Sequence, residues 1–309
     1  MDKEKVDPEF EKLMIEYEQA AKSGATEKAE AIAVDLLSKA STAMEDSDDP
    51  WLNHMRLAGE RLAALEWDDA IREYEQAIAA TASLQGGESL ASKTYGDISR
   101  VHALHDRLPE ALDAASRGVE AAREYIASAV LSMALEVKIG CHLRPGQAVE
   151  ALASAEEALS LLEGKPPHSP MRARLLVGRA GCLVKLGRID EARADLTTAF
   201  NLLAPSANSP VSAGFRSGLA RWYEVDGKIR DVDGDLAGAA NARANALDHA
   251  RAVDMMPQVA GVFTRNAVAT ALHRYSLALA RTGDVDGARR ASAESDAIRN
   301  GLRLPRLSG

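Results

Sequence analysis

Small and apolar residues recur along this chain with the spacing of an α-helix, and glycines and prolines interrupt the pattern at regular intervals. In EWDDAIREYEQAIAA (66–80), Ala70, Tyr74 and Ala77 stand three or four positions apart, so they share one helix face. The runs of β-branched and aromatic residues that strands require are missing, and aromatic residues make up only 4% of the chain. The pattern therefore predicts an all-α fold.

One motif repeats along the sequence: a glycine, four further residues, and an alanine that opens an amphipathic segment. It occurs at Gly24/Ala29, Gly146/Ala151, Gly187/Ala192, Gly234/Ala239 and Gly283/Ala288 and, with another residue in place of glycine, at Leu65/Ala70 and Asp106/Ala111. Successive alanines are 41, 41, 40, 41, 47 and 49 residues apart. We expect the glycine to end one helix in a left-handed conformation and the alanine to lie where two helices cross closely.

The spacing of the motif, together with the prolines, predicts seven antiparallel helix hairpins in a single array over 1–309. Their expected ranges are 8–44, 51–81, 88–124, 125–164, 170–204, 210–251 and 257–300. In the sixth, DGKIRDVDGD (226–235) is interpreted as an insertion between the two helices. Residues 301–309 are expected to form a flexible tail. The alternative is that they dock on a neighbouring copy of the chain.

The motif resembles the tetratricopeptide repeat, and the best copy is LVKLGRIDEARADLTTAFNLLAP (183–205). The period near 41 exceeds the usual ~34 and is similar to the lengthened repeats of kinesin light chains and large bacterial regulators. HEAT and armadillo arrays, with periods of ~40–47, are the alternative solenoid. The resemblance implies a right-handed α-solenoid whose first helices line a concave groove that takes a partner segment.

Charge divides the chain into two unlike halves. Residues 1–164 carry 16 Lys+Arg and 32 Asp+Glu, whereas residues 165–309 carry 21 and 14, nearly all of the basic ones being arginine. Because arginine suits bidentate capture of carboxylates and phosphates, arginines on the expected first helices of the last three hairpins are candidate partner-binding residues. They are Arg172, Arg174, Arg179, Arg216, Arg221, Arg265, Arg274 and Arg281. Solvated helix faces and internal pairing with acids of the second helices are the alternatives.

Motifs for catalysis or cofactor binding are missing from the sequence, so we expect a protein that is not an enzyme and has no cofactor. His102 and His105, three positions apart, lack further ligands to complete a metal site. Asp231, Asp233 and Asp235 fail the calcium-loop pattern and are interpreted as an acidic turn. The aromatic set Trp51, Trp67, Tyr74 and Tyr95 is expected in the core, as are the cysteines, Cys141 and Cys182, which stand one repeat apart.

These patterns favour a protein–protein interaction scaffold that binds an acidic segment of a protein or peptide in the groove of the C-terminal half. A peptide- or effector-sensing regulatory module is the alternative function. Nucleic-acid binding is disfavoured by the net charge of −9 and the lack of interleaved aromatics. The oppositely charged halves permit a homo-oligomer. The N-terminal stretch MDKEKVDPEFEK does not resemble a signal peptide, and no segment reads as membrane-spanning, so a cytoplasmic location is expected.

Overall fold

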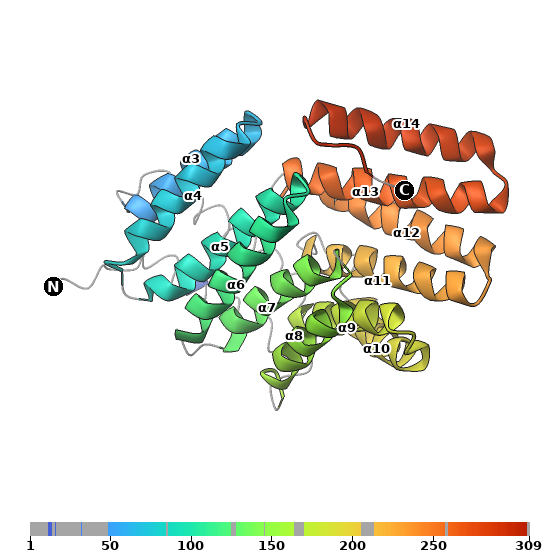
Figure 1. The fold of residues 1–309 in the computed structure, drawn as a ribbon, viewed down its shortest axis with the longest axis horizontal. Coiled ribbons are helices and arrows are strands. Elements are labelled where there is room, and N and C mark those ends of the chain that lie inside the picture. The colour runs from blue at the N-terminus through green and yellow to red at the C-terminus, as the bar shows by residue number, and fades with distance from the viewer. Residues whose placement is uncertain are drawn as a thin grey trace.

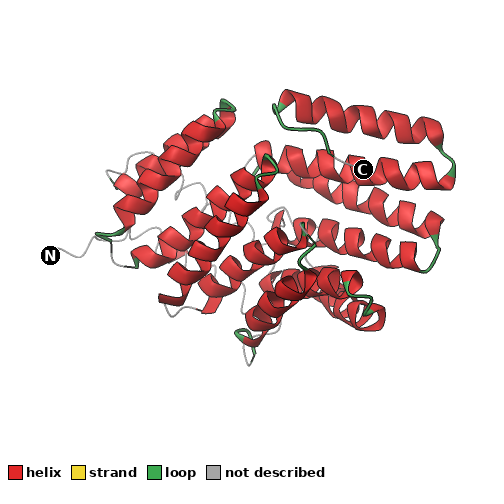
Figure 2. Ribbon diagram, in the orientation of Figure 1, coloured by secondary structure: helices red, strands yellow, loops and turns green. Residues whose placement is uncertain are grey.

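A computed structural model describes residues 49–307, apart from 85, 125–127, 145, 164–169, 205–212 and 257–258, together with positions 12, 13, 16 and 32. Within these residues the chain forms twelve helices, α3 to α14, and no strand (Figures 1 and 2). The helices pair in sequence as six hairpins that stack into a curved array. The all-α solenoid predicted from the sequence is confirmed. The first predicted hairpin, 8–44, falls almost wholly outside the described residues.

The six described hairpins each consist of a first helix and a second helix. They are α3 (Pro50–Ala63) with α4 (Trp67–Thr81), α5 (Gly87–Leu104) with α6 (Leu108–Glu124), α7 (Ser128–Leu143) with α8 (Ala148–Ser160), α9 (Pro170–Lys185) with α10 (Ile189–Leu203), α11 (Ala213–Val232) with α12 (Leu236–Asp254), and α13 (Val262–Thr282) with α14 (Val285–Gly301). None of these described helices is both long and apolar enough to cross a lipid bilayer.

In four of the described hairpins the motif glycine occupies the turn between the two helices, as expected. Gly146, Gly187, Gly234 and Gly283 all have φ between 74° and 88°, the left-handed region in which glycine has no steric penalty. Leu65 and Asp106, which replace glycine in the first two described hairpins, keep this conformation with φ of 61° and 62°. The backbone of the turn is therefore the same in all six hairpins, whatever residue stands there.

The alanine of the motif lies at the crossing of the two helices of each hairpin. Ala70, Ala111, Ala151, Ala192 and Ala239 are all fully buried or nearly so. Ala288, in the last described helix α14, is only half-buried. Trp51, Trp67 and Tyr74 are buried as well, which confirms that they belong to the core.

Hairpins stack through two kinds of contact. Each second helix packs on the first helix of the next hairpin, and the first helices α5, α7, α9 and α11 pack on one another in turn. The first helices α11 and α13, both fully described, do not pack closely together. Instead Ala246 and Ala250 of α12 line the space between them. The inner wall of the array is therefore open at this point.

Residues 226–235 were predicted to be an insertion between the two helices of the sixth predicted hairpin, and this prediction is wrong. Residues 226–232 form the last turns of α11, and only 233–235 make the turn into α12. The prediction was wrong because Gly227 and four aspartates suggested a loop, yet Gly227 is buried within α11, next to Ala239 and Arg243 of α12. Asp235 caps α12 by accepting a hydrogen bond from the Gly238 N–H at 2.8 Å.

The C-terminal segment is not a free tail over its described part, 301–307. Leu302 and Leu304 are only 3% and 5% exposed, and they belong to an apolar cluster with residues of α3, α4 and α5. The cluster also includes Leu62, Trp67 and Ile98. The array thus curves back until its C-terminal segment shares an apolar cluster with its first two described hairpins, and we call Leu302 and Leu304 the clasp.

Candidate binding cavity

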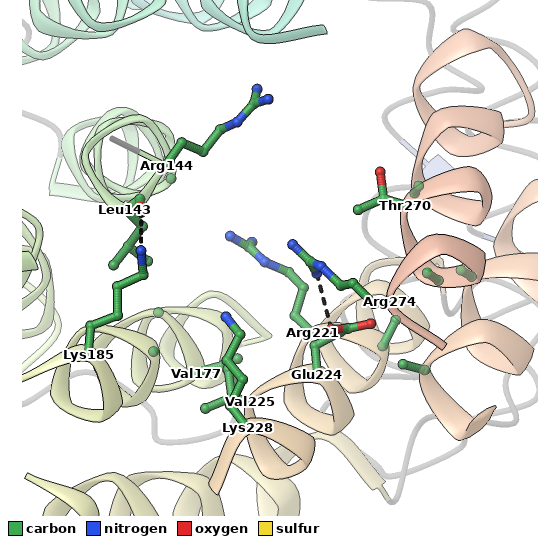
Figure 3. A pocket seen from close by; sticks show the side chains of 18 residues that line it. Leu143, Arg144, Val177, Lys185, Arg221, Glu224, Val225, Lys228, Thr270 and Arg274 are labelled. Atoms are coloured by element: carbon green, nitrogen blue, oxygen red, sulfur yellow. Dashed lines mark hydrogen bonds and ion pairs between the residues drawn. The ribbon is translucent and has the colours of Figure 1, made fainter. Parts of the chain in front are cut away.

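A cavity of about 520 Å³ lies on the inner side of the curve, at the opening between α11 and α13 (Figure 3). Its walls come from the first helices α7, α9, α11 and α13 and from α12. Small residues on these helices leave the space empty: Gly140, Gly178, Gly181, Ala220, Ala246, Ala250, Ala267 and Ala271. The volume lies within the roughly 300–1,000 Å³ typical of ligand sites.

Most of the charged side chains in the wall of the cavity are positive. They are Arg144, Lys185, Arg221, Lys228 and Arg274, against one carboxylate, that of Glu224. Arg221 and Lys228 are seven positions apart, so they rise from the same face of α11, and Arg274 approaches from α13 (Figure 3). Of the eight arginines selected from the sequence, two, Arg221 and Arg274, line this cavity.

Glu224 pairs with Arg274 across the cavity wall. The distance from Nη1 of Arg274 to Oε2 of Glu224 is 3.2 Å, and the glutamate is only 8% exposed. Neither carboxylate oxygen of Glu224 accepts a hydrogen bond of ordinary geometry from the described residues. The interaction between Arg274 and Glu224 is therefore mainly electrostatic. Removing Arg274 alone would leave the buried carboxylate of Glu224 without a counter-charge.

A second carboxylate, Glu136 of α7, lies between two of the predicted arginines. Nε of Arg174 donates to Oε1 and Oε2 of Glu136 at 3.1 and 3.2 Å, and Nη1 of Arg221 donates to Oε1 at 2.7 Å. Glu136 and Arg174 also line a smaller cavity of about 290 Å³ between α5, α7 and α9. One glutamate therefore connects the walls of two neighbouring cavities.

Lys228 and Lys185 are the two cations of the cavity that form no ion pair with a described carboxylate, and Lys228 is the more buried of the two. Burial lowers its pKa to about 8, and the nearby positive charge of Arg274 acts in the same direction. The Lys185 ammonium, by contrast, donates to the Leu143 carbonyl at 2.7 Å. Lys228 thus stands as a half-buried cation that still carries its proton through most of the neutral pH range.

Two of the predicted arginines pair inside the fold. Arg179 forms a bidentate ion pair with Asp195 of α10, at 2.7 and 2.6 Å, which raises the pKa of the guanidinium. Arg281 donates to Asp231 of α11 at 2.6 Å. Arg179 therefore pairs with an acid of a second helix, which was the alternative, whereas Arg281 shares an acid of the first helix α11 with Arg243.

The other three predicted arginines lie outside the main cavity. Arg172 donates to the Leu162 carbonyl at 3.5 Å, and Nε of Arg216 is buried with no hydrogen-bond acceptor among the described residues. Arg265 is exposed on α13. The eight candidates therefore do not form one continuous stripe.

Four charged residues of the cavity are not among the candidates chosen from the sequence: Arg144, Lys185, Glu224 and Lys228. Arg144 follows α7 in the acidic half of the chain, and Lys228 and Glu224 fall in or beside the segment interpreted as an insertion. A helical interpretation of 226–232 would have put Lys228 seven positions after Arg221 on one face, which is the signal that was available.

The histidines and cysteines that were considered as reactive or metal-binding residues are partly or fully buried in the fold. Burial lowers the pKa values of His102 and His105, and the described residues contain no group of three side chains placed to hold a metal ion. Cys141 and Cys182 are buried free thiols, and burial raises the pKa of Cys182 to about 11. Such thiols are poor nucleophiles at neutral pH.

Comparison with known proteins places the fold. No protein-family model matches the sequence, and no curated protein matches it. Among solved structures, the apo form of RapI covers 96% of this chain and 99% of its own, at 11% identity and a TM-score of 0.59. Aspartyl phosphate phosphatase F from Bacillus subtilis covers 97% and 85%, at 12% identity and 0.54. A Rap protein complexed with competence and sporulation factor covers 98% and 89%, at 13% identity and 0.53.

At these identities the likeness concerns the fold alone. Together with the repeated turn, the buried alanines and the stacked hairpins, it shows that the chain is a tetratricopeptide-like repeat protein.

Proposed function

We propose that this protein is a non-catalytic scaffold that binds an acidic segment of a partner protein or peptide on the inner wall of its C-terminal half. The observation that carries the proposal is the cavity between α11 and α13, whose wall bears five cations and one glutamate. Solenoids bind partners along such extended inner surfaces. An acidic segment would also meet a steering field from the arginine-rich second half of the chain.

Two arginines of the cavity would anchor the segment. The Arg221 side chain is about half exposed, although its Nη1 already donates to Glu136. Its guanidinium group therefore has further N–H donors for a ligand. Arg274 is equally accessible beside Glu224. The apolar part of the wall, including Val177 and Val225, would take the side chains between the acidic ones.

The test is affinity capture from the native organism with the full chain as bait, followed by mass spectrometry. We compare the wild type with Arg221→Gln, and with Arg193→Gln as a matched control that removes the same charge from the second helix α10. The proposal predicts proteins captured by the wild type and the control and lost by Arg221→Gln, and lost also at high salt. Equal capture by all three baits would contradict it.

A second candidate is a sensory module that binds a small effector. The volume of the cavity, about 520 Å³, favours it, as does the similarity of the fold to a Rap protein that was solved with competence and sporulation factor. A screen of peptides and metabolites by thermal shift distinguishes the two functions. A ligand that raises the melting temperature of the wild type but not of Arg221→Gln supports the sensory module.

A further inference from the structure

The charges around the cavity do not balance. Six cations surround it or share its carboxylates: Arg144, Arg174, Lys185, Arg221, Lys228 and Arg274. Only three carboxylates face them, which are Asp106 on Arg144, Glu136 on Arg174 and Arg221, and Glu224 on Arg274. Three positive charges are therefore left without a described counter-charge on this part of the wall.

Lys228 is the cation without an ion pair that is least exposed to water. Lys228 lies half-buried on α11, where Arg274 and, to a smaller extent, Lys185 and Arg243 add to the positive potential at its ammonium group and Glu224 offsets part of it. A desolvated cation without a partner lowers the stability of the fold, and such local conflicts are typical of binding sites. An anion that enters the cavity would remove the conflict.

We propose that the cavity binds a phosphoryl group, held by Arg221, Lys228 and Arg274. This proposal rests on the proposed function and specifies the chemistry of its anchor. The three side chains point into one space from two helices (Figure 3). A carboxylate carries one negative charge, whereas a phosphomonoester carries roughly −1.5 to −2 on a single compact group at neutral pH. One phosphoryl group therefore matches the surplus better than one carboxylate does.

The donor set also fits phosphate. Two guanidinium forks supply paired N–H donors that match phosphate oxygens, and the lysine adds a point charge between them. The carboxylate of Glu224 does not repel the group strongly, because Arg274 lies 3.2 Å from it. The phosphoryl group would come either from a phosphorylated side chain of a partner segment or from a small phosphorylated metabolite.

Calorimetric titration of the full chain tests the proposal with four probes: inorganic phosphate, ribose 5-phosphate, and two acetylated, amidated pentapeptides, Ala-Ala-phosphoserine-Ala-Ala and Ala-Ala-Glu-Ala-Ala. We expect at least one phosphorylated probe to bind more tightly than the glutamate peptide. Lys228→Met should weaken that binding about tenfold or more. Arg289→Met, which removes one charge from an exposed position of α14, should leave it unchanged.

The outcomes separate this proposal from the one on which it rests. Tighter binding of the phosphopeptide identifies a phosphorylated partner segment as the source, and tighter binding of ribose 5-phosphate identifies a metabolite. If the glutamate peptide binds as tightly as the phosphorylated probes, or if Lys228→Met binds like the wild type, the phosphoryl proposal is wrong. Capture of partners that depends on Arg221 would still support the scaffold in that case.

Discussion

Arg221 of α11 donates a hydrogen bond at 2.7 Å to Glu136 of α7, a residue 85 positions earlier in the sequence. The contact bridges two hairpins along the inner wall, and Arg174 of α9 reaches the same carboxylate from between them. Three consecutive hairpins are therefore tied together by charge on the face where we place the partner.

Glu136 has two arginine partners, Arg174 and Arg221, and we expect their removal to lower the free energy of unfolding by different amounts. Arg221→Gln leaves Glu136 paired with Arg174, so we expect the free energy of unfolding to fall by less than about 1 kcal/mol. Arg174→Gln removes the more buried partner and should cost about 1–3 kcal/mol. Urea denaturation measures both. Equal losses would show that Arg221 is mainly structural rather than available for binding.

Lys228→Met should stabilise the free protein. The folded-state pKa of Lys228 is lowered to about 8 from its usual value near 10.5, by burial and by the charge of Arg274, with smaller effects of the same sign from Lys185 and Arg243 and an opposing one from Glu224. The unfolded chain thus binds more protons between these values, and the contribution of Lys228 to stability rises with pH from about 8 to about 10.5.

At pH 7 the lysine is charged in both states and its desolvation cost is fully present, so removing it should raise the free energy of unfolding by about 1 kcal/mol. The gain of the variant over the wild type should shrink as the pH rises towards 10. Chemical denaturation at pH 7 and pH 9.5 measures the two gains. A variant that is less stable than the wild type at pH 7 would mean that Lys228 has a counter-charge in the fold.

Leu304→Ala tests the clasp between the two ends of the array. Leu304 is 5% exposed in the cluster that contains Trp67, so its truncation should cost about 2 kcal/mol or more. We also expect faster amide hydrogen exchange in α3 and α4. Arg306→Ala, two residues further on and exposed, serves as the control. The clasp is refuted if both variants unfold and exchange like the wild type.

A pair of glycine substitutions tests the repeated turn. Gly187 has φ of 74° with open space around the position of a Cβ atom, so Gly187→Ala should destabilise by roughly 1 kcal/mol through backbone strain alone. Gly59 also has open space but lies in the exposed interior of α3. Gly59→Ala should therefore stabilise by about 0.5–1 kcal/mol. Thermal unfolding should show shifts of opposite sign, and shifts of equal sign would refute the assignment.

The architecture was predictable from the sequence because it depends on local rules. The alanine at each crossing and the left-handed residue five positions earlier recur in the sequence, and both act within one hairpin. The clasp was not predictable, because Leu302 and Leu304 meet their partners only once the whole array has curved back.

The site was predictable only in part. Arg221 and Arg274 were selected by residue type and helix position, but the same rule selected Arg179, which pairs with Asp195. Whether a given arginine faces a cavity or an acid depends on its exact rotation about the helix axis, which the sequence pattern does not fix. Self-association through the oppositely charged halves stays a prediction.

The most direct test of the account is hydrogen–deuterium exchange of the full chain with and without a segment of a captured partner. The account predicts slower exchange in α9, α11 and α13, whose side chains line the cavity, and little change in the second helices α10 and α14. Protection confined to α10 and α14, or no protection of α11 and α13 at saturating partner, would contradict binding on the inner wall.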